Sequence, residues 1–269
     1  MSKHLFVYSK LGFKLVKHTS VISRTVWANI TSVVTVVLLV SMVACSTSSK
    51  KTSGSEADKD LGVFLTYSER DENKNNYLVS IFINSQFMHM SDDHSKNDYV
   101  LFDRKKREIY NVNSEDKTIL VIKSRAVTVK PPLDIQYKII SKPSAAIPQV
   151  QGNTATHYRF EVNGKQCYDA VSMELTFMPD ALKAMKEYRN VLAGEHAKTV
   201  NNIPKDMLDA CDLALNVFYP NKYLDNGLPM REWDRKGYRR FLVQYKFNYK
   251  LPEENLTLPD GYEKYSIGE

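Results

Sequence analysis

One short segment of the sequence carries side chains that could bind a divalent metal ion. It runs His89-Met-Ser-Asp92-Asp93-His94, so two imidazoles and two carboxylates stand within six residues. Imidazole nitrogens and carboxylate oxygens are ligands that Zn²⁺ and similar ions use in proteins. The segment is expected in a polar loop between strands, and no further ligand is placed beside it. A solvated turn is the favoured interpretation and a metal site the alternative, so no metal and no cofactor are predicted.

Two further histidines could take part in proton transfer. His196 follows Glu195 at the expected end of a helix, where a histidine complements the helix dipole. His157 begins an expected strand and is interpreted as an edge residue. The short motifs of serine hydrolases, zinc proteases and phosphate-binding loops are absent from the sequence. We therefore predict no catalytic residue; a hydrolase or metal-dependent enzyme whose site is scattered along the chain is the alternative.

Cys45 closes an apolar stretch that follows a basic N-terminus. Five Lys and Arg residues and no acidic residue occur among residues 1–44, and 26–44 carry no charge. A basic head, an apolar stretch and small residues together predict an export signal. The segment Met42-Val-Ala-Cys45 resembles the lipobox of bacterial lipoproteins, although Met42 replaces the usual leucine. The resemblance implies cleavage before Cys45 and acyl chains such as palmitate on that cysteine, which would hold the protein on a membrane.

The alternative for this segment is a retained transmembrane anchor. Nineteen uncharged residues precede Cys45. At the rise of an α-helix, a stretch of this length can span a bilayer with little tilt.

The basic composition belongs mostly to the predicted signal. The formal net charge is +6, but without the five basic residues of 1–44 there remain 32 Lys and Arg against 31 Asp and Glu, or +1. A nucleic-acid-binding domain normally carries a basic surface of its own. The charge therefore gives no reason to expect a nucleic-acid partner.

Cys167 and Cys211 are the two cysteines that remain if Cys45 carries lipid. An even number of cysteines in an oxidising compartment predicts a disulfide. It would close a loop of roughly 43 residues and stabilise the fold by about 4 kcal/mol in the chain-entropy model. Two buried free thiols are the alternative.

The chain divides into three segments by composition. Residues 1–44 form the predicted signal, and 45–60 are mostly Ser, Thr, Lys and Asp. A segment of that composition cannot bury enough apolar surface to fold, so it is interpreted as a flexible tether. Residues 61–269 suit one α+β domain.

Alternating and β-branched residues predict strands through the first half of this domain. They are expected at 61–67, 77–83, 86–90, 99–103, 108–112, 118–124, 133–140, 157–162 and 165–172. Asn163-Gly164 joins the last two, and this dipeptide favours a two-residue hairpin turn because both positions tolerate positive φ.

Two helices are expected next, followed by two strands. The first helix runs from Pro179 to about His196, and the second starts near Pro204 and carries apolar residues at helical spacing. The last strands are expected at 228–233 and 238–249. An antiparallel sheet with two helices on one face is an α+β fold, and we expect the sheet to be curved like a half-barrel.

Two surface features admit both a binding role and an ordinary one. Phe241, Tyr245, Phe247 and Tyr249 alternate along the last strand, so they are expected to share one face. That face could line a ligand cavity or pack on the helices. The basic turn 104–107 could touch anionic lipid head groups or be a solvated hairpin tip.

Several turn and cysteine motifs carry a resemblance to known proteins. The segments are Gly164-Lys-Gln-Cys167, Phe218-Tyr-Pro220, Gly227-Leu-Pro229, Asp234-Arg-Lys-Gly237 and Leu258-Pro-Asp-Gly-Tyr262. They resemble a family of uncharacterised exported lipoproteins of proteobacteria. The order of strands and helices is similar to the half-barrel fold of the outer-membrane lipoprotein carrier and receptor proteins. That likeness implies a curved sheet closed over helices around a lipid-accepting cavity, and it transfers no functional residue.

These observations lead to an expected function. We expect a non-catalytic lipoprotein of the cell envelope, anchored through Cys45 and facing the periplasm. It would bind an apolar ligand, such as a lipid or a lipoprotein acyl chain, or an envelope protein partner; a structural subunit of an envelope complex is the further alternative. Ser46 favours the outer membrane, because lipoproteins kept in the inner membrane typically carry Asp after the cysteine.

Overall fold

The computed structural model describes residues 7–9, 12–14, 60–95, 97–145 and 147–267. The lipobox with Cys45 and nearly all of the tether lie outside these residues. Val7–Ser9 (β1) and Gly12–Lys14 (β2) pair with each other as a separate two-stranded sheet. Among the described residues, no helix is both long and apolar enough to cross a membrane.

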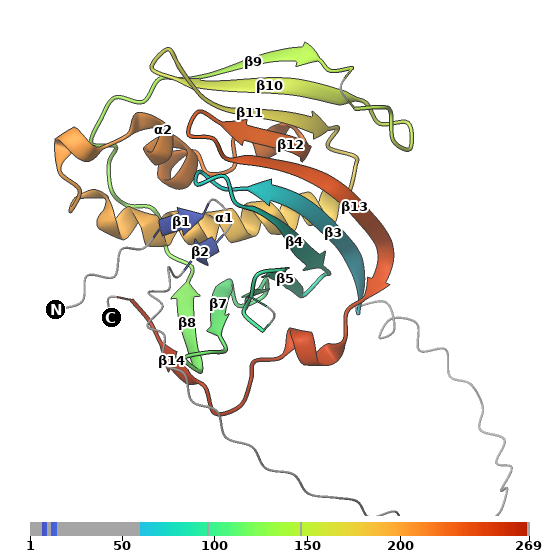
Figure 1. The fold of residues 1–269 in the computed structure, drawn as a ribbon. Helices are drawn as coiled ribbons and strands as arrows, with labels where there is room; N and C mark the ends of the chain where they lie inside the picture. The colour runs from blue at the N-terminus through green and yellow to red at the C-terminus, as the bar shows by residue number, and fades with distance from the viewer. Residues whose placement is uncertain (1–6, 10–11, 15–59, 96, 146, 268–269) are drawn as a thin grey trace, which may run out of the picture.

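A single twelve-stranded sheet carries the fold (Figure 1). Its strands follow the order β14-β8-β7-β6-β5-β4-β3-β13-β12-β11-β10-β9, and every pair is antiparallel except β14 with β8. The strands are β3 (Leu61–Arg70), β4 (Asn76–Ile83), β5 (Phe87–Asp92), β6 (Tyr99–Asp103), β7 (Glu108–Asn113), β8 (Thr118–Lys123), β9 (Tyr137–Pro143), β10 (Ala155–Val162), β11 (Lys165–Met173), β12 (Leu228–Asp234), β13 (Arg239–Lys250) and β14 (Glu263–Tyr265).

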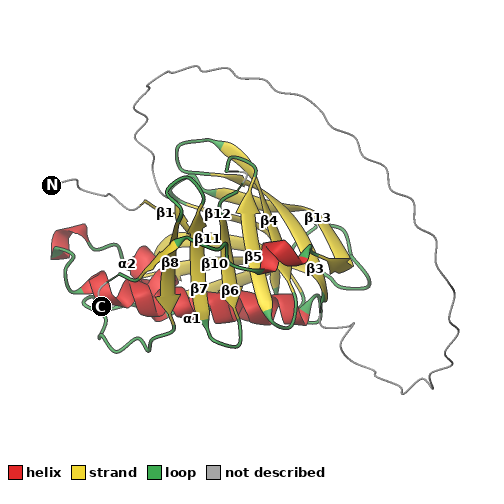
Figure 2. Ribbon diagram, turned by 90° about the horizontal axis from the view of Figure 1, so that it is seen from below, coloured by secondary structure: helices red, strands yellow, loops and turns green. Residues whose placement is uncertain are grey.

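The sheet curves around one long helix. This is α1 (Pro179–Val200), which lies along one face of the strands in Figure 2. A short helix α2 (Ala210–Leu213) continues into a π-helical turn at Ala214–Phe218. The predicted α+β fold with a curved, half-barrel-like sheet and two helices is therefore confirmed.

β13 joins the two halves of the sheet. It pairs with β12 on one side and with β3, the first strand of the sheet in sequence, on the other. Its register against β3 shifts between Leu242 and Gln244 and again between Lys246 and Tyr249. Bulges of this kind bend a strand and increase its twist, which allows a twelve-residue strand to follow the curvature of the sheet.

The concave face of the sheet forms the main core with α1. Leu65, Phe102 and Phe160 from the sheet have no exposed surface, and Tyr188 from α1 is 1% exposed. The Phe102 and Tyr188 rings meet edge to face with their centroids 5.8 Å apart. Burial of such aromatic side chains supplies much of the free energy that stabilises a core.

A second, smaller core lies on the opposite face of β5 to β8. Leu101, Tyr110 and Ile119 are buried there against Leu258 and Tyr262 from the C-terminal segment. The Tyr99 hydroxyl donates a hydrogen bond to the carbonyl oxygen of Thr257 (2.7 Å), and β14 pairs with β8. The C-terminal segment therefore covers this half of the sheet.

A disulfide connects the sheet to the second helix. Cys167 on β11 is bonded to Cys211 on α2, with Cα atoms 5.4 Å apart, so the predicted pairing is confirmed. The predicted start of the second helix near Pro204 is wrong by several residues, because Asp209 caps the helix. Its side chain accepts hydrogen bonds from the backbone N–H groups of Cys211 and Asp212.

Candidate functional site

Three charged side chains form one row across the concave face of the sheet. Glu69 on β3 pairs with Arg240 on β13, and Arg240 pairs with Glu232 on β12. Arg240 Nε lies 3.3 Å from Glu69 Oε1, and Arg240 Nη1 lies 3.2 Å from Glu232 Oε2. Glu69 is 1% exposed, Arg240 is 5% exposed and Glu232 is 3% exposed. This ion row is therefore closed to solvent.

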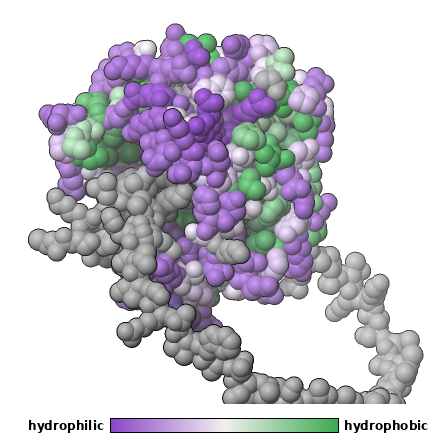
Figure 3. All heavy atoms as spheres, viewed as in Figure 1, coloured by the Kyte–Doolittle hydropathy of each residue, from purple (hydrophilic) through white to green (hydrophobic). Residues whose placement is uncertain are grey.

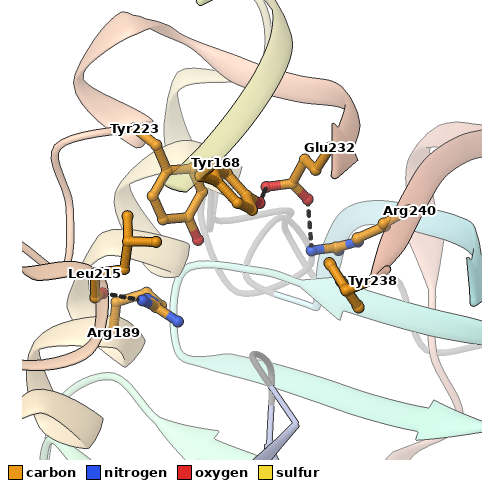
Figure 4. Close-up of a pocket in the computed structure, with 7 residues that line it drawn as sticks. All are labelled: Tyr168, Arg189, Leu215, Tyr223, Glu232, Tyr238 and Arg240. Atoms are coloured by element: carbon orange, nitrogen blue, oxygen red, sulfur yellow. Dashed lines mark hydrogen bonds and ion pairs between the residues drawn. The ribbon is translucent and has the colours of Figure 1, made fainter. Parts of the chain in front are cut away.

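Tyrosine side chains surround this buried ion row. The Arg240 guanidinium lies 3.5 Å from the centre of the Tyr67 ring. Tyr77 donates its hydroxyl hydrogen to Glu69 Oε2 (3.1 Å), and Tyr168 donates to Glu232 Oε1 (Figure 4). Burial raises the pKa of the Glu69 carboxyl above its usual range, although Arg240 opposes this shift. The pairing with Arg240 is thus what offsets the cost of burying the carboxylates.

Two small cavities adjoin the buried ion row. Glu232, Arg240, Tyr223 and Arg189 line both of them, and each has about 10 Å³ accessible to a water-sized sphere. A volume of that size holds about one water molecule. Nε and Nη2 of Arg240 have no hydrogen-bond partner within the described part of the chain. A single water suits these donors, whereas an organic substrate would not fit beside them.

An open groove with a volume of about 650 Å³ lies at one end of α1. Arg107, at the turn between β6 and β7, and Arg125, just after β8, contribute its cationic rim. Ala193, Val217 and Phe218 contribute apolar walls from α1 and the π-helical turn. The volume falls within the range of about 300–1,000 Å³ that is typical of small-molecule sites.

A glycine in α1 brings the two sides of the groove together. A Cβ atom at Gly194 would lie 2.3 Å from the carbonyl oxygen of Arg125, which no side chain could tolerate. The segment after β8 therefore runs directly against α1. Glycine costs about 1 kcal/mol in a helix interior relative to alanine, so this contact is a local reason for its presence.

Side chains of α1 hold the π-helical wall of the groove. Arg189, which is buried, donates hydrogen bonds to the carbonyl oxygens of Leu215 and Pro220. His196 donates from Nδ1 to the carbonyl oxygen of Asn216 (3.3 Å), because a carbonyl can only accept. These bonds satisfy carbonyls that the end of a helical segment leaves unpaired. The predicted role of His196 as a cap of its own helix is wrong, since α1 continues to Val200.

The predicted metal-binding segment is spread over strand β5 and the turn after it. His89 is buried and its ring stacks on that of Tyr99. Asp92 accepts hydrogen bonds from the N–H groups of His94 and Ser95, and Asp93 accepts one from Leu78 N–H. Within the residues that the structure describes, no three His, Cys, Asp or Glu side chains meet in a metal-binding group. The segment therefore acts as a hydrogen-bonded turn here.

The aromatic residues of β13 do not share one face as expected. Phe241 pairs with Ser68, whereas Tyr245 pairs with the buried Leu65, so the two rings lie on opposite faces of the sheet. The bulge after Leu242 changes the alternation. Tyr245 packs on Phe177 in the main core, and the ring of Tyr249 lies 4.7 Å from that of Phe64. Phe241 and Phe247 are 45% and 41% exposed.

Two other polar residues have partners that the sequence did not reveal. His157 is not an edge residue, because β10 lies between β9 and β11. Its Nε2 is 2.7 Å from Oδ1 of Asp169, and its ring stacks on Trp233. At the predicted basic turn, Arg104 is also not solvated, since it forms an ion pair with Glu187 of α1 (2.8 Å).

Comparisons with known proteins add no function. No family model and no curated protein matches the chain. Among solved structures, an uncharacterized conserved protein from Thermus thermophilus has 9% identity and a TM-score of 0.39, over 78% of this chain and 93% of that one. PNGF-II has 12% identity and a TM-score of 0.38, over 77% and 31%. MucB has 10% identity and a TM-score of 0.36, over 77% of this chain and 61% of MucB.

These solved structures differ in how much of their own length is matched. The chain spans about a third of PNGF-II and less than two thirds of MucB. Likenesses with such TM-scores and identities carry no argument about this chain, so its function has to be argued from its own residues.

Proposed function

We propose that this chain is a membrane-anchored, periplasm-facing lipoprotein that binds an apolar ligand and catalyses no reaction. The ligand is a lipid or an acyl chain with an anionic head, and its binding site is the groove between the end of α1 and the segment after β8. Cys45 carries the anchor, in the outer membrane rather than the inner one. An envelope protein partner is the alternative occupant of the same groove.

The groove is the observation that carries this proposal. Arg107 and Arg125 line it together with apolar side chains from α1 and the π-helical turn. Arginine is suited to carboxylate and phosphate because its planar guanidinium can donate two parallel hydrogen bonds. Apolar walls suit a hydrocarbon chain, whose burial is favourable by about 0.8 kcal/mol per methylene. The combination supports an anionic amphiphile rather than a fully apolar one.

Two further observations support the proposal, one on the compartment and one on the enzyme alternative. The Cys167–Cys211 disulfide supports an oxidising compartment. The buried ion row is too enclosed to admit a substrate, so the strongest cluster of titratable groups gives no support to the enzyme alternative.

A fluorescent fatty acid, dansyl-undecanoic acid, tests the groove. The protein is the chain from Ser46 to its C-terminus, which includes every strand of the large sheet, both helices and the disulfide. We expect saturable binding that the double variant Arg107→Gln, Arg125→Gln weakens by about tenfold or more, because two charge-assisted contacts are removed. The measurement is fluorescence titration.

Lys105→Gln with Lys130→Gln is the matched control. Both lysines are exposed and neither lines the groove, so the same loss of charge leaves binding unchanged. Equal weakening by both double variants would mean that only net charge matters. Absence of saturable binding would remove the amphiphile from the groove and favour the envelope protein partner.

A further inference from the structure

The convex face of the sheet carries a second group of charged side chains, opposite the buried ion row. Cross-strand partners share a face, and one row of partners runs from Arg70 to Arg239, Trp233, Asp169 and Arg159. This row alternates with the buried row of Glu69, Arg240 and Glu232 along the same strands. Its side chains therefore point away from α1.

At the centre of this face, arginine and aromatic residues alternate both along each strand and between neighbouring strands. Trp233 pairs with Arg239, and Arg231 pairs with Phe241. Each strand thus contributes one arginine and one aromatic residue, two positions apart, in a checkerboard. Arg231, Arg239 and Phe241 are exposed, and hydrophobic side chains reach the surface where β13 and its neighbours run in Figure 3. We call Arg70, Arg159, Arg231, Arg239, Trp233 and Phe241 the arginine–aromatic face.

The arginines of this face other than Arg159 have no carboxylate partner among the described residues. Asp169 is the carboxylate of its row, and it is fully buried beneath His157 and Arg159, with which it pairs. Arg231 and Arg239 form no ion pair within the part of the chain that the structure describes. Nε of Arg70 is buried and lacks a hydrogen-bond partner among the same residues. The face therefore attracts anions.

We infer that the arginine–aromatic face docks on the anionic phospholipid surface of a membrane. Guanidinium groups bind phosphates, and Trp and other aromatic side chains favour the interface between head groups and acyl chains. A row of charges that extends across five strands suits an extended lipid surface better than a single small ligand. The inference rests on the proposed function in one respect, because the anchor at Cys45 is what places the domain at a membrane. Residues 46–60 separate this anchor from the first strand of the large sheet.

The tether is long enough for this orientation. Fifteen residues can span at most about 50 Å when fully extended. The domain can therefore lie with this face on the membrane to which it is anchored. A basic patch adds to an acyl anchor, since lipid attachment and surface charge act together.

Sedimentation with lipid vesicles tests the inference on the unlipidated chain from Ser46. We expect binding to vesicles of phosphatidylglycerol mixed with phosphatidylcholine, and none to phosphatidylcholine alone. Arg231→Glu with Arg239→Glu is expected to weaken binding by about tenfold or more. Lys183→Glu with Lys205→Glu makes the same charge change at exposed positions on α1 and the loop after it, and leaves binding unchanged.

Other outcomes overturn the inference in distinct ways. Equal losses in both double variants would show attraction by net charge alone. Binding to polyglutamate or to a single-stranded oligonucleotide but not to anionic vesicles would assign the face to an acidic protein or a nucleic acid. Because this chain carries no lipid, its failure to bind leaves the anchor at Cys45 intact, and the anchor is tested separately by mass.

Discussion

Several buried polar residues in this protein pair with other groups inside the fold. Arg240 lies between two carboxylates and over a tyrosine ring. Arg189 donates hydrogen bonds to two carbonyl oxygens of the groove wall. Removing one member of such a buried set would leave an unpaired charge or carbonyl, which costs more than the interaction itself contributes. Other, exposed arginines lie instead at the groove and on the convex face.

Two buried histidines make stability depend on pH. Burial lowers the pKa of His89 to about 4, and burial together with the nearby Arg189 lowers that of His196 to about 4. Below pH 6.5 the unfolded chain gains protons that the folded chain accepts only near pH 4. The contribution of each histidine to the free energy of unfolding is therefore fully present above pH 6.5. It is lost as the pH falls from 6.5 towards 4, and the loss is about 2 kcal/mol per histidine at pH 5.

His89→Phe tests this dependence. Phenylalanine can keep the stacking on Tyr99 and has no proton to bind. We expect the loss of unfolding free energy between pH 7 and pH 5, measured by urea denaturation, to be smaller than in the wild type by about 1–2 kcal/mol. His94→Phe, at an exposed position, is the control. It should lose as much unfolding free energy between pH 7 and pH 5 as the wild type. A wild-type pH dependence in His89→Phe would contradict a neutral, buried His89.

At the scale of elements, short-range signals predicted more than long-range ones. Asn163 and Gly164 have φ of 53° and 73°, as the hairpin between β10 and β11 requires. The extent of β14 and its parallel pairing with β8 were missed, because three exposed residues show no alternation. The bulges in β13 were missed as well, since they depend on how the strand crosses the sheet and not on its composition.

The disulfide gives the second helical segment its position. α2 has only four residues, so packing and the covalent bond to β11 hold it in place. We expect Cys167→Ala with Cys211→Ala to lower the unfolding free energy by roughly 2–4 kcal/mol, because the cross-link restricts the unfolded chain. Urea denaturation measures this loss. Thiol titration of the unfolded, unreduced protein provides the check, and two reactive thiols would refute the pairing.

At the scale of the whole molecule, the fold class and the curved sheet followed from the order of strands and helices. Neither candidate surface was predicted as a whole, although the sequence singled out the basic turn 104–107 and Phe241. The groove is assembled from residues as far apart in sequence as Arg107 and Phe218, and the convex face from strands β3, β10, β12 and β13. The convex face also depends on β13 pairing between β3 and β12, and no local pattern specifies that choice of neighbours.

One measurement tests both the proposed lipid anchor at Cys45 and the proposed amphiphile in the groove. It is native and denaturing mass spectrometry of the protein extracted from the membranes of cells that produce the full chain. We expect the denatured mass to be that of a chain that begins at an acylated Cys45. The native mass should be larger by the mass of a bound amphiphile. The added mass should be lost in Arg107→Gln with Arg125→Gln. A protein that keeps Met1 would contradict the lipid anchor, and a native mass without added ligand would contradict the binding role of the groove.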